Sequence, residues 1–248
     1  MSLRLPLLDS DPASPFPPAG DALLEPDGLL AMGGDLSPRR LLNAYAHGIF
    51  PWFSSGQPIL WWSPDPRTVF RTDGVRLSAR TRRQLRHRDW RIVADRDFDA
   101  VVAACASAPR PGQDGTWITR DMQAAYGELH RLGHAHSIEV REGGTPCGGR
   151  LVGGLYGVAI GRMLFGESMF SAETGASKAA LAGLALRLRG WGWPLIDAQV
   201  GNPHLDTLGA EAWPRTRFLA TIAGLCAQPV DAGSWAETFG ILSASTLG

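Results

Sequence analysis

One short stretch of the sequence places a single carboxylate among apolar side chains. Glu167 lies in the run Leu164-Phe165-Gly166-Glu167-Ser168-Met169-Phe170, which otherwise resembles a strand. A buried or half-buried carboxylate needs a hydrogen-bond donor or a cation beside it, because leaving water without one is costly. The adjacent glycine allows a ligand to approach closely. The pattern favours a catalytic or binding role for Glu167; the alternative is a structural hydrogen-bond acceptor.

A second polar pair interrupts an apolar run at residues 195–200. Asp197 and Gln199 are two residues apart, and side chains in a strand alternate between its two faces. We therefore expect both side chains on one face, where they can orient a polar substrate. The alternative is that they complete hydrogen bonds at the end of a strand.

Several catalytic patterns are missing from the sequence. It has no GxGxxG, GxxxxGK[ST], HExxH or GxSxG motif, which removes the strongest signals for dinucleotide, phosphate-loop, zinc-peptidase and α/β-hydrolase chemistry. His130, His134 and His136 are close in sequence, but Gly133 interrupts them and no companion cysteine or acidic cluster lies nearby, so we expect no metal site. Cys147 has no partner histidine in sequence, which argues against a nucleophilic thiol.

Arginines gather in one region of a neutral chain. The protein has 24 Lys+Arg and 24 Asp+Glu, yet residues 67–96 hold ten arginines against three aspartates. A tryptophan-rich segment, residues 49–66, precedes them. Arginine contacts phosphate and aromatic rings stack on bases, so the combination favours nucleic-acid binding. The alternative is a solvated helix face. Isolated tryptophans are more often core residues, and packing is the expectation for Trp61, Trp62, Trp90 and Trp213.

Local signals predict the elements that position these residues. Ser37, Ser78 and Thr119 can each cap a helix, the last of which stops at Gly133. Further helices are expected at about 177–189 and 216–226, and strands at 137–140, 151–160, 163–170 and 195–200. This order indicates an α/β fold, of α+β type, with a mixed sheet.

Length and composition predict a folded, loop-rich protein. Of the 248 residues 44% are hydrophobic, while 30 are Gly and 18 are Pro. We expect a small N-terminal domain at residues 1–65, beginning with an irregular arm of about 20 residues, and a larger domain at 66–248. With no long apolar run, no recognisable signal peptide and three cysteines without CxxC spacing, we expect a cytoplasmic protein with no membrane partner.

Seven ordered blocks of sequence resemble the bacterial leucyl/phenylalanyl-tRNA–protein transferase family, and the resemblance spans about residues 15–220. The blocks are Gly28–Leu36, Gly48–Phe53, Trp61–Arg67, Gly115–Thr119, Gly133–Glu139, Gly166–Ser171 and Ile196–Gln199. The chain departs from the family pattern in a longer Gly-rich turn at Gly143–Gly149, in Leu155 where a Met is expected, and in the tail from Ala227.

The resemblance implies an enzyme that moves Leu or Phe, and less readily Met, from aminoacyl-tRNA to the α-amine of proteins that begin with Arg or Lys, which marks them for degradation. It also implies a catalytic domain similar to GCN5-related N-acetyltransferases, in agreement with the mixed sheet. The aminoacyl ester is already activated, so no ATP and no other cofactor is expected. We expect the protein to act as a monomer.

The resemblance also implies roles for individual residues. Trp52 and Trp117 would hold the terminal adenosine of the tRNA. An apolar pocket would receive the aminoacyl side chain, with walls from Leu155, Met169, Phe170 and Ile196. The arginine-rich segment would hold the acceptor stem through phosphate contacts, with Arg76, Arg80 and Arg83 as its representatives.

The reaction is aminolysis of an ester, which needs an unprotonated amine, a stabilised oxyanion and a destination for one proton. The catalytic candidates are Glu167, Gln199 and Asp197. Glu167 would orient the incoming amine or pair with the cationic side chain of the acceptor. A neutral amide is too weak a base to take a proton, so Gln199, held by Asp197, would position the amine or carbonyl while the proton leaves through the ribose hydroxyl or water.

Two other functions use the same features. An acyl-CoA-dependent N-acyltransferase would share the fold, but the phosphate loop [RQ]xxGx[GA] typical of that class is absent. A tRNA- or peptide-binding module without chemistry would need only the aromatic and arginine features. Transfer from Leu-tRNA to a free peptide amine distinguishes an enzyme from both.

Overall fold

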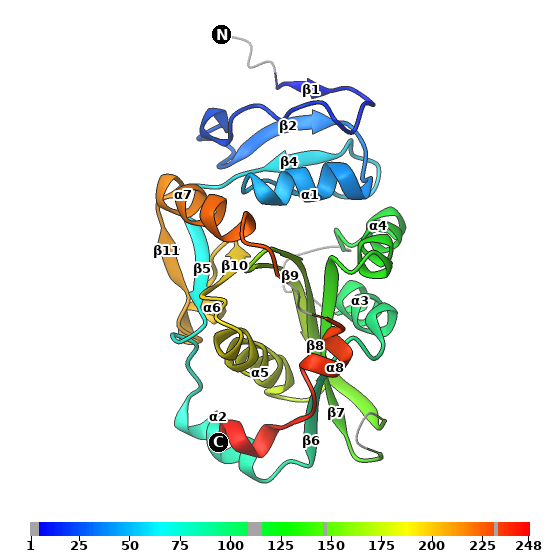
Figure 1. The fold of residues 1–248 in the computed structure, drawn as a ribbon, viewed down its shortest axis with the longest axis vertical. Helices are drawn as coiled ribbons and strands as arrows, with labels where there is room; N and C mark the ends of the chain where they lie inside the picture. The colour runs from blue at the N-terminus through cyan, green and yellow to red at the C-terminus, as the bar shows by residue number, and fades with distance from the viewer. Residues whose placement is uncertain (1–4, 109–115, 146–147, 231–232) are drawn as a thin grey trace.

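The chain forms two sheets that follow one another along the long axis of the molecule (Figure 1). This computed structural model describes residues 5–108, 116–145, 148–230 and 233–248. The smaller sheet has the strand order β1-β2-β4-β3 and the larger the order β11-β5-β10-β9-β8-β7-β6-β12. The predicted mixed α/β architecture is confirmed, whereas the likeness to GCN5-related N-acetyltransferases stays a prediction.

The smaller sheet is built entirely from the first quarter of the chain. Its strands are β1 (Leu7–Leu8), β2 (Leu29–Gly33), β3 (Phe50–Pro51) and β4 (Leu60–Trp62). Because Leu7 and Leu8 pair in parallel with β2, the expectation that the first 20 residues are wholly irregular is wrong at this point. A short 3₁₀ helix, η1 (Ala19–Asp21), follows β1.

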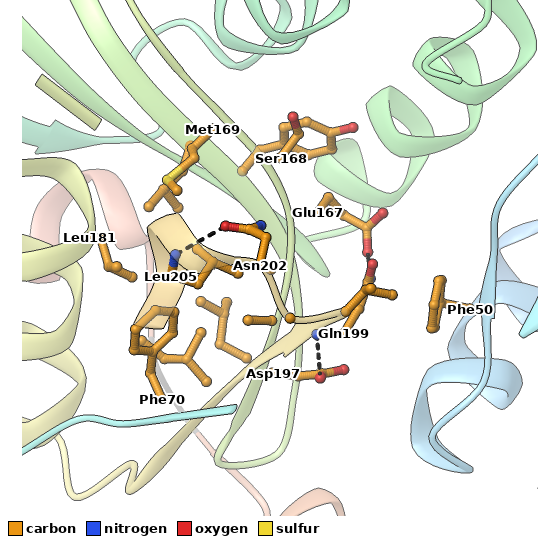
Figure 2. A pocket seen from close by; sticks show the side chains of 18 of the residues that line it. Phe50, Phe70, Glu167, Ser168, Met169, Leu181, Asp197, Gln199, Asn202 and Leu205 are labelled. Carbon is orange, nitrogen blue, oxygen red and sulfur yellow. Dashed lines mark hydrogen bonds between the residues drawn. The ribbon is translucent and has the colours of Figure 1, made fainter. Parts of the chain in front are cut away.

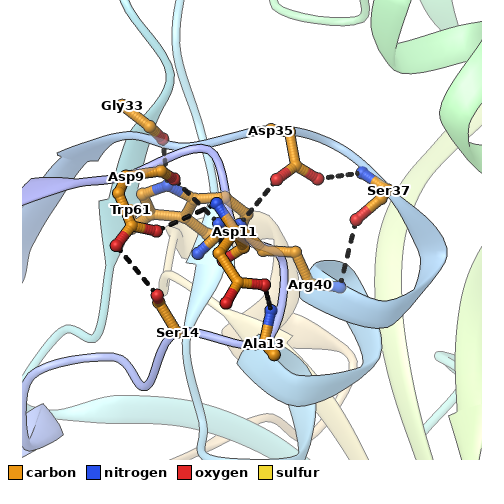
Figure 3. Close-up of polar contacts among 9 residues, drawn as sticks. All are labelled: Asp9, Asp11, Ala13, Ser14, Gly33, Asp35, Ser37, Arg40 and Trp61. Atoms are coloured by element: carbon orange, nitrogen blue, oxygen red, sulfur yellow. Dashed lines mark hydrogen bonds and ion pairs between the residues drawn. The ribbon is translucent and has the colours of Figure 1, made fainter.

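Arg40 fastens the N-terminal segment to this sheet. It lies on α1 (Pro38–Ala46), and its buried guanidinium donates to the Asp35 carboxylate at 3.0 Å and to the backbone carbonyls of Asp9 and Asp11 (Figure 3). The helix begins where its sequence indicates, because the Ser37 hydroxyl accepts a hydrogen bond from the Arg40 N–H.

The larger sheet consists of antiparallel pairs with one parallel pair near its middle. Its strands are β5 (Arg67–Arg71), β6 (Trp90–Ala94), β7 (Ala135–Glu142), β8 (Arg150–Ile160), β9 (Met163–Ser171), β10 (Leu195–Gln199), β11 (Glu211–Trp213) and β12 (Leu242–Ser243). β9 and β10 are parallel and are joined by α5 (Ala176–Gly190), while β8 and β9, both of which were predicted as strands, form a hairpin around Gly161. β5 and β6 were not predicted.

Helices cover both faces of the larger sheet (Figure 1). α3 (Phe98–Ser107) and α4 (Arg120–Arg131) share one hydrophobic cluster with α1 and the smaller sheet, while α5 shares a second cluster with the C-terminal segment. Since the first cluster contains residues from both sheets, the two parts of the chain have a continuous core. The domain boundary at residue 65 stays a prediction.

The helix starts expected at Ser78 and Thr119 are confirmed. The Ser78 hydroxyl accepts from the Thr81 N–H at the start of α2 (Ala79–Arg86), and the Thr119 hydroxyl accepts from the Met122 N–H at the start of α4. α6 (Pro203–Thr207) and α7 (Arg215–Cys226) follow β10 and β11. No helix among the described residues is long and apolar enough to cross a membrane.

The C-terminal tail is part of the fold. After α8 (Trp235–Thr238), β12 pairs antiparallel with β6 and the final 3₁₀ helix, η2 (Ala244–Leu247), packs on α2. The Trp235 ring stacks on His136 with the centroids 4.0 Å apart. The tail therefore completes one edge of the larger sheet.

Candidate active site

The parallel strands β9 and β10 separate in the middle of the larger sheet. Their pairing ends at Asp197 and Phe165, although β9 continues to Ser171. The carboxyl ends of parallel strands in an α/β unit are where ligands commonly bind. Glu167 and Gln199 lie just beyond the last paired residues.

A β-bulge sets the direction of Glu167. In the pairing of β8 with β9, Tyr156 lies opposite Ser168 and Gly157 lies opposite Gly166, which leaves Glu167 as an extra residue without a partner in β8. Bulges turn side chains out of the regular alternation and are frequent beside active sites. The bulge therefore turns a carboxylate toward the gap between the strands.

A second bulge sets the direction of Gln199. Asp197 pairs with Val69 of β5 and Gln199 with Thr68, so Ala198 is extra and the strict alternation expected from the sequence is interrupted. Gln199 takes a left-handed backbone with φ of 61°, and its N–H donates to Asp197 Oδ1 at 2.9 Å. Asp197 therefore contacts Gln199 through its backbone N–H, while the positioning role expected of the pair stays a prediction.

Glu167 is the centre of a compact hydrogen-bond network. Tyr45 donates to its Oε1 at 2.7 Å and Tyr126 to its Oε2 at 2.8 Å. Gln199 Nε2 donates to Oε1 at 2.9 Å, and the two tyrosine hydroxyl oxygens lie in direct contact with one another. These donors are the partners that a half-buried carboxylate requires.

The surroundings of Glu167 raise its pKa to about 7, because burial outweighs the stabilising hydrogen bonds from both tyrosines and Gln199, and the nearby Asp197 charge adds to the rise. Burial and the Glu167 charge raise the pKa values of Tyr45 and Tyr126 well above 10. Both phenols therefore remain hydrogen-bond donors at neutral pH, where Glu167 is poised between its two protonation states.

The network borders a cavity of about 420 Å³, a volume typical of small-molecule sites. One end of this cavity is apolar and the other carries Glu167 and Gln199 (Figure 2). The apolar end is lined from β5, β8, β9, β10, α5 and α6 by Phe70, Leu155, Leu164, Met169, Leu181, Leu184, Ile196 and Leu205. A ligand that carries an apolar side chain and a reactive carbonyl can place the side chain at the apolar end and the carbonyl beside Glu167 and Gln199.

Three of the four predicted pocket residues line the apolar end. Leu155 and Met169 are directly opposite one another across β8 and β9, and Ile196 lies beside Leu164 in the register of β10 and β9. Methionine suits a pocket that admits side chains of different shape, since its thioether repacks at low cost.

The prediction that Phe170 lines this pocket is wrong. Phe170 follows Met169 in a strand, so its side chain points to the opposite face of the sheet. There it is buried in the cluster that contains α3, above Gly154, where a Cβ would lie 3.3 Å from the Phe170 ring.

The predicted adenosine-binding tryptophans both line the cavity. Trp52 is 38% exposed, so part of its side chain is accessible to a ligand. It contacts Trp62, whose tilted ring has its centroid 5.6 Å away and whose indole N–H donates to the Trp52 carbonyl at 2.7 Å. Trp117 comes from the segment before α4.

The arginine-rich segment divides into paired and unpaired residues. Arg67 is wholly buried against Asp197, so it does not belong to a surface patch. Arg71 pairs with Asp73, and Arg88 pairs with Glu142. Arg76, Arg80 and Arg83 are exposed and make no ion pair with any described residue. The Arg76 N–H donates to Leu208 at the end of α6, a helix that lines the cavity.

The other candidate groups lie outside the cavity. His136 Nδ1 contacts the Asp95 carboxylate at 2.7 Å and His130 Nδ1 contacts the Ala135 carbonyl at 2.8 Å. Within the described residues no group of three or more His, Cys, Asp or Glu side chains is placed to hold a metal ion. Cys147 lies outside the residues that the structure describes. Trp61, Trp90 and Trp213 are buried, as predicted.

Sequence reasoning did not find Tyr45, Tyr126 or Arg67 as parts of the site. Tyr126 lies on the buried face of α4, and a buried tyrosine hydroxyl needs a partner. That requirement matches the need of Glu167 for donors, but the two residues are 41 positions apart. Only the packing of α1 and α4 against β8 and β9 brings the tyrosines to the carboxylate.

Comparison with known families identifies most of the chain. Residues 69–223 match the family described as Leucyl/phenylalanyl-tRNA protein transferase, and residues 34–65 match the description Leucyl/phenylalanyl-tRNA protein transferase N-terminal domain. A solved structure, "The structure of L-PGS from Bacillus licheniformis", is similar with a TM-score of 0.39 and 10% identity over 81% of this chain and 74% of that one.

Curated relatives extend the match to the full length. The chain is 63% identical over 249 residues to the leucyl/phenylalanyl-tRNA–protein transferase of Xanthomonas axonopodis pv. citri, covering 100% of this chain and 98% of that protein. It is 65% identical to the protein of the same name from Xanthomonas campestris pv. campestris, with the same coverage, and 59% identical to that from Xylella fastidiosa over 94% of each. The resemblance in the seven blocks is thereby confirmed: the chain belongs to the leucyl/phenylalanyl-tRNA–protein transferase family.

Proposed function

We propose that this protein transfers Leu or Phe, and less readily Met, from aminoacyl-tRNA to the α-amine of proteins that begin with Arg or Lys. The transfer would mark those proteins for degradation, and the enzyme would act as a cytoplasmic monomer without a cofactor. Family membership supports the class of reaction. The observation that carries the proposal is the cavity with an apolar end beside the Glu167–Gln199 pair and an accessible Trp52 at its side.

The two ends of the cavity fit the two parts of an aminoacyl-adenosine. The Leu or Phe side chain would enter between Met169, Leu181 and Leu205, and its carbonyl would then lie near Glu167 and Gln199. Trp52 and Trp117 would stack on the terminal adenine. Apolar pockets separate side chains that differ by one methylene by only ~1–3 kcal/mol, which accounts for partial acceptance of Met.

Aminolysis forms a bond between the amine nitrogen and the carbonyl carbon and breaks the bond from that carbon to the ribose oxygen. An α-amine has a pKa of about 7.7–8.0, so part of it is neutral at cytoplasmic pH. Ionised Glu167 would attract and orient the acceptor amine or its cationic side chain. The ribose oxygen would leave with the proton released by the amine, directly or through water.

Gln199 would position the reactants through its amide. Since Nε2 donates to Glu167 at 2.9 Å, the amide oxygen is turned away and can accept a hydrogen bond from the incoming amine. Asp197 and the left-handed backbone fix this orientation. Positioning of this kind can contribute several kcal/mol to the acceleration.

Transfer of radiolabelled leucine tests the proposal directly. The assay combines the purified chain with Leu-tRNA and a peptide that begins with Arg, and the control peptide is identical but acetylated at its N-terminus. We expect label only on the free amine. Label on neither peptide would overturn the proposed activity, and equal label on both would overturn the assignment of the α-amine as acceptor.

Replacing Trp52 or Trp117 with alanine is expected to weaken binding of aminoacyl-tRNA. Base stacking contributes roughly 1–3 kcal/mol per base, so each substitution should raise the dissociation constant about 5- to 150-fold in a filter-binding assay. Trp213→Phe changes an indole that does not line the cavity and should alter affinity less than twofold. A double Trp52→Ala/Trp117→Ala variant that consumes charged tRNA at the parent rate would contradict the assignment.

The double variant Arg80→Ala/Arg83→Ala should reduce the salt dependence of tRNA binding. Each lost phosphate contact lowers the slope of log affinity against log salt concentration by about 0.7–0.9, so we expect a decrease of about 1.5. Arg71→Ala provides the control, because that guanidinium is already paired with Asp73 at 2.8 Å. An unchanged slope in the double variant would show that the acceptor stem follows another surface.

A further inference from the structure

Arg67 is held on every side although it lies outside the cavity. Its Nε donates to Asp197 Oδ1 at 2.8 Å and its NH2 nitrogen to Asp197 Oδ2 at 2.6 Å. The NH1 nitrogen donates to the Gly48 carbonyl at 3.1 Å. The guanidinium also lies between two rings, 4.8 Å from the centroid of Phe50 and 4.7 Å from that of Phe218. Both members of the ion pair are fully buried.

The same Asp197 oxygen that accepts from Arg67 Nε accepts from the backbone N–H of Gln199. This hydrogen bond supports a left-handed backbone at Gln199, a conformation that is unfavourable for residues other than glycine and persists only where neighbouring groups hold it. A small rotation of the Asp197 carboxylate would move the N–H and, with it, the amide that contacts Glu167. The contacts thus run from Arg67 through Asp197 to Gln199 and Glu167.

The planar guanidinium is the feature that fixes the carboxylate. Two parallel hydrogen bonds define the plane of Asp197, and the third, to Gly48, defines the position of Arg67 itself. A lysine ammonium carries the same charge but acts as a point charge, so it cannot fix the plane of the Asp197 carboxylate. Charge and orientation can therefore be separated experimentally.

We propose that Arg67 is a positioning residue for aminoacyl transfer, which sets the Gln199 amide against Glu167 by fixing the plane of the Asp197 carboxylate. The inference rests on the proposed function. It assigns to Arg67 an effect on the rate of transfer beyond its effect on stability, without contact with either substrate. The effect would therefore appear in kcat and not in the affinity for tRNA.

The test compares Arg67→Lys with Arg40→Lys in the full-length chain. Arg40 is the matched control, because it is also a buried arginine bound to one carboxylate and to backbone carbonyls (Figure 3), and none of its partners lines the cavity. Transfer of leucine to an Arg-peptide is measured at a temperature where circular dichroism shows both variants fully folded. We expect Arg67→Lys to lower kcat about 10- to 100-fold with KM for Leu-tRNA changed less than threefold, and Arg40→Lys to keep the parent kcat.

The pH profile supplies a readout that a purely structural role would not move. The hydrogen bond from Gln199 lowers the pKa of Glu167, so a loosened amide should shift the midpoint of kcat against pH upward in Arg67→Lys and leave it unchanged in Arg40→Lys. If Arg67→Lys has the parent kcat and midpoint once folded, the inference is wrong, while transfer by the parent enzyme still supports the proposed function.

A second variant applies should Arg67→Lys fail to fold. Phe218→Leu removes one of the two rings that hold the guanidinium and leaves all its hydrogen bonds in place. We expect a smaller decrease in kcat than in Arg67→Lys, about threefold, with KM for Leu-tRNA again unchanged. A folded Phe218→Leu enzyme with the parent kcat would overturn the inference.

Discussion

Glu167→Gln is expected to lower kcat/KM for leucyl transfer to an Arg-peptide by about 100-fold or more. The substitution preserves the size of the side chain and removes the negative charge that would orient the cationic acceptor, and groups that act on protons or charge at a reaction centre typically contribute 10²–10⁴-fold. Steady-state transfer kinetics with Leu-tRNA measure the effect. Glu173→Gln is the matched control, because Glu173 pairs with Arg150 and does not line the cavity.

The part of the parent enzyme's pH dependence that comes from Glu167 should disappear with the same substitution, which leaves only the rise that follows deprotonation of the acceptor α-amine at about pH 7.7–8.0. Burial raises the pKa of Glu167 to about 7, so kcat/KM of the parent should rise as the pH increases through 7 and Glu167 becomes ionised. A Glu167→Gln enzyme that retains both this rise and the parent rate would show that Glu167 is only a structural hydrogen-bond acceptor.

The unfolding free energy of the protein should change with pH in the direction opposite to kcat/KM. The carboxyl pKa is raised in the folded state from an ordinary value of 4.5, so the folded protein holds a proton that the unfolded chain releases. The stabilisation that the protonated Glu167 carboxyl contributes is complete below pH 4.5 and is lost as the pH rises to 7. In the parent this titration should lower the unfolding free energy by up to about 3 kcal/mol between pH 4.5 and 7. Glu167→Gln should remove that decrease, and denaturant titrations at several pH values would measure it.

Asp197→Leu should destabilise the fold by about 3–5 kcal/mol. The substitution leaves the Arg67 guanidinium buried without its anion, and an uncompensated buried charge has a cost of that order. Urea unfolding followed by tryptophan fluorescence measures the loss. The control is Asp73→Leu, which removes the partner of an exposed pair with Arg71 and should change stability by less than about 1 kcal/mol.

Removing both charges separates stability from catalysis. The double variant Arg67→Met/Asp197→Leu replaces the buried pair with apolar side chains of similar volume, a change that is often neutral for stability. It should recover most of the unfolding free energy but not the transfer activity, because the Gln199 N–H would have no acceptor. Recovery of activity along with stability would contradict the role given to Asp197.

The sequence was most informative where structure is determined locally. Ser37, Ser78 and Thr119 cap the helices that they were expected to start, because a cap side chain and the backbone N–H that donates to it are only three residues apart. The strands around Gly161 and the helix before residue 190 follow from short-range patterns of apolar residues.

The geometry of the site depends on contacts that no local pattern contains. Arg67 and Asp197 are 130 positions apart, and Tyr45 and Glu167 are 122 apart. Arg67 was therefore counted with the surface arginines, although it is the most deeply buried charge of its segment. Phe170 was assigned to the pocket because its block matches the family, but the alternation of β9 sends it to the other face. The types of residue in the site could be predicted from the sequence, but the directions in which their side chains point could not.

Both outermost strands of the larger sheet are very short. β11 has three residues and β12 has two, so the rims of an eight-stranded sheet present few free backbone groups to another molecule. A long exposed edge strand can pair with strands of neighbouring copies and start aggregation. Natural proteins avoid this by keeping edge strands short or covered. The brevity of β11 and β12 therefore leaves little exposed edge for a strand of another copy to extend, a feature unrelated to any chemistry at Glu167.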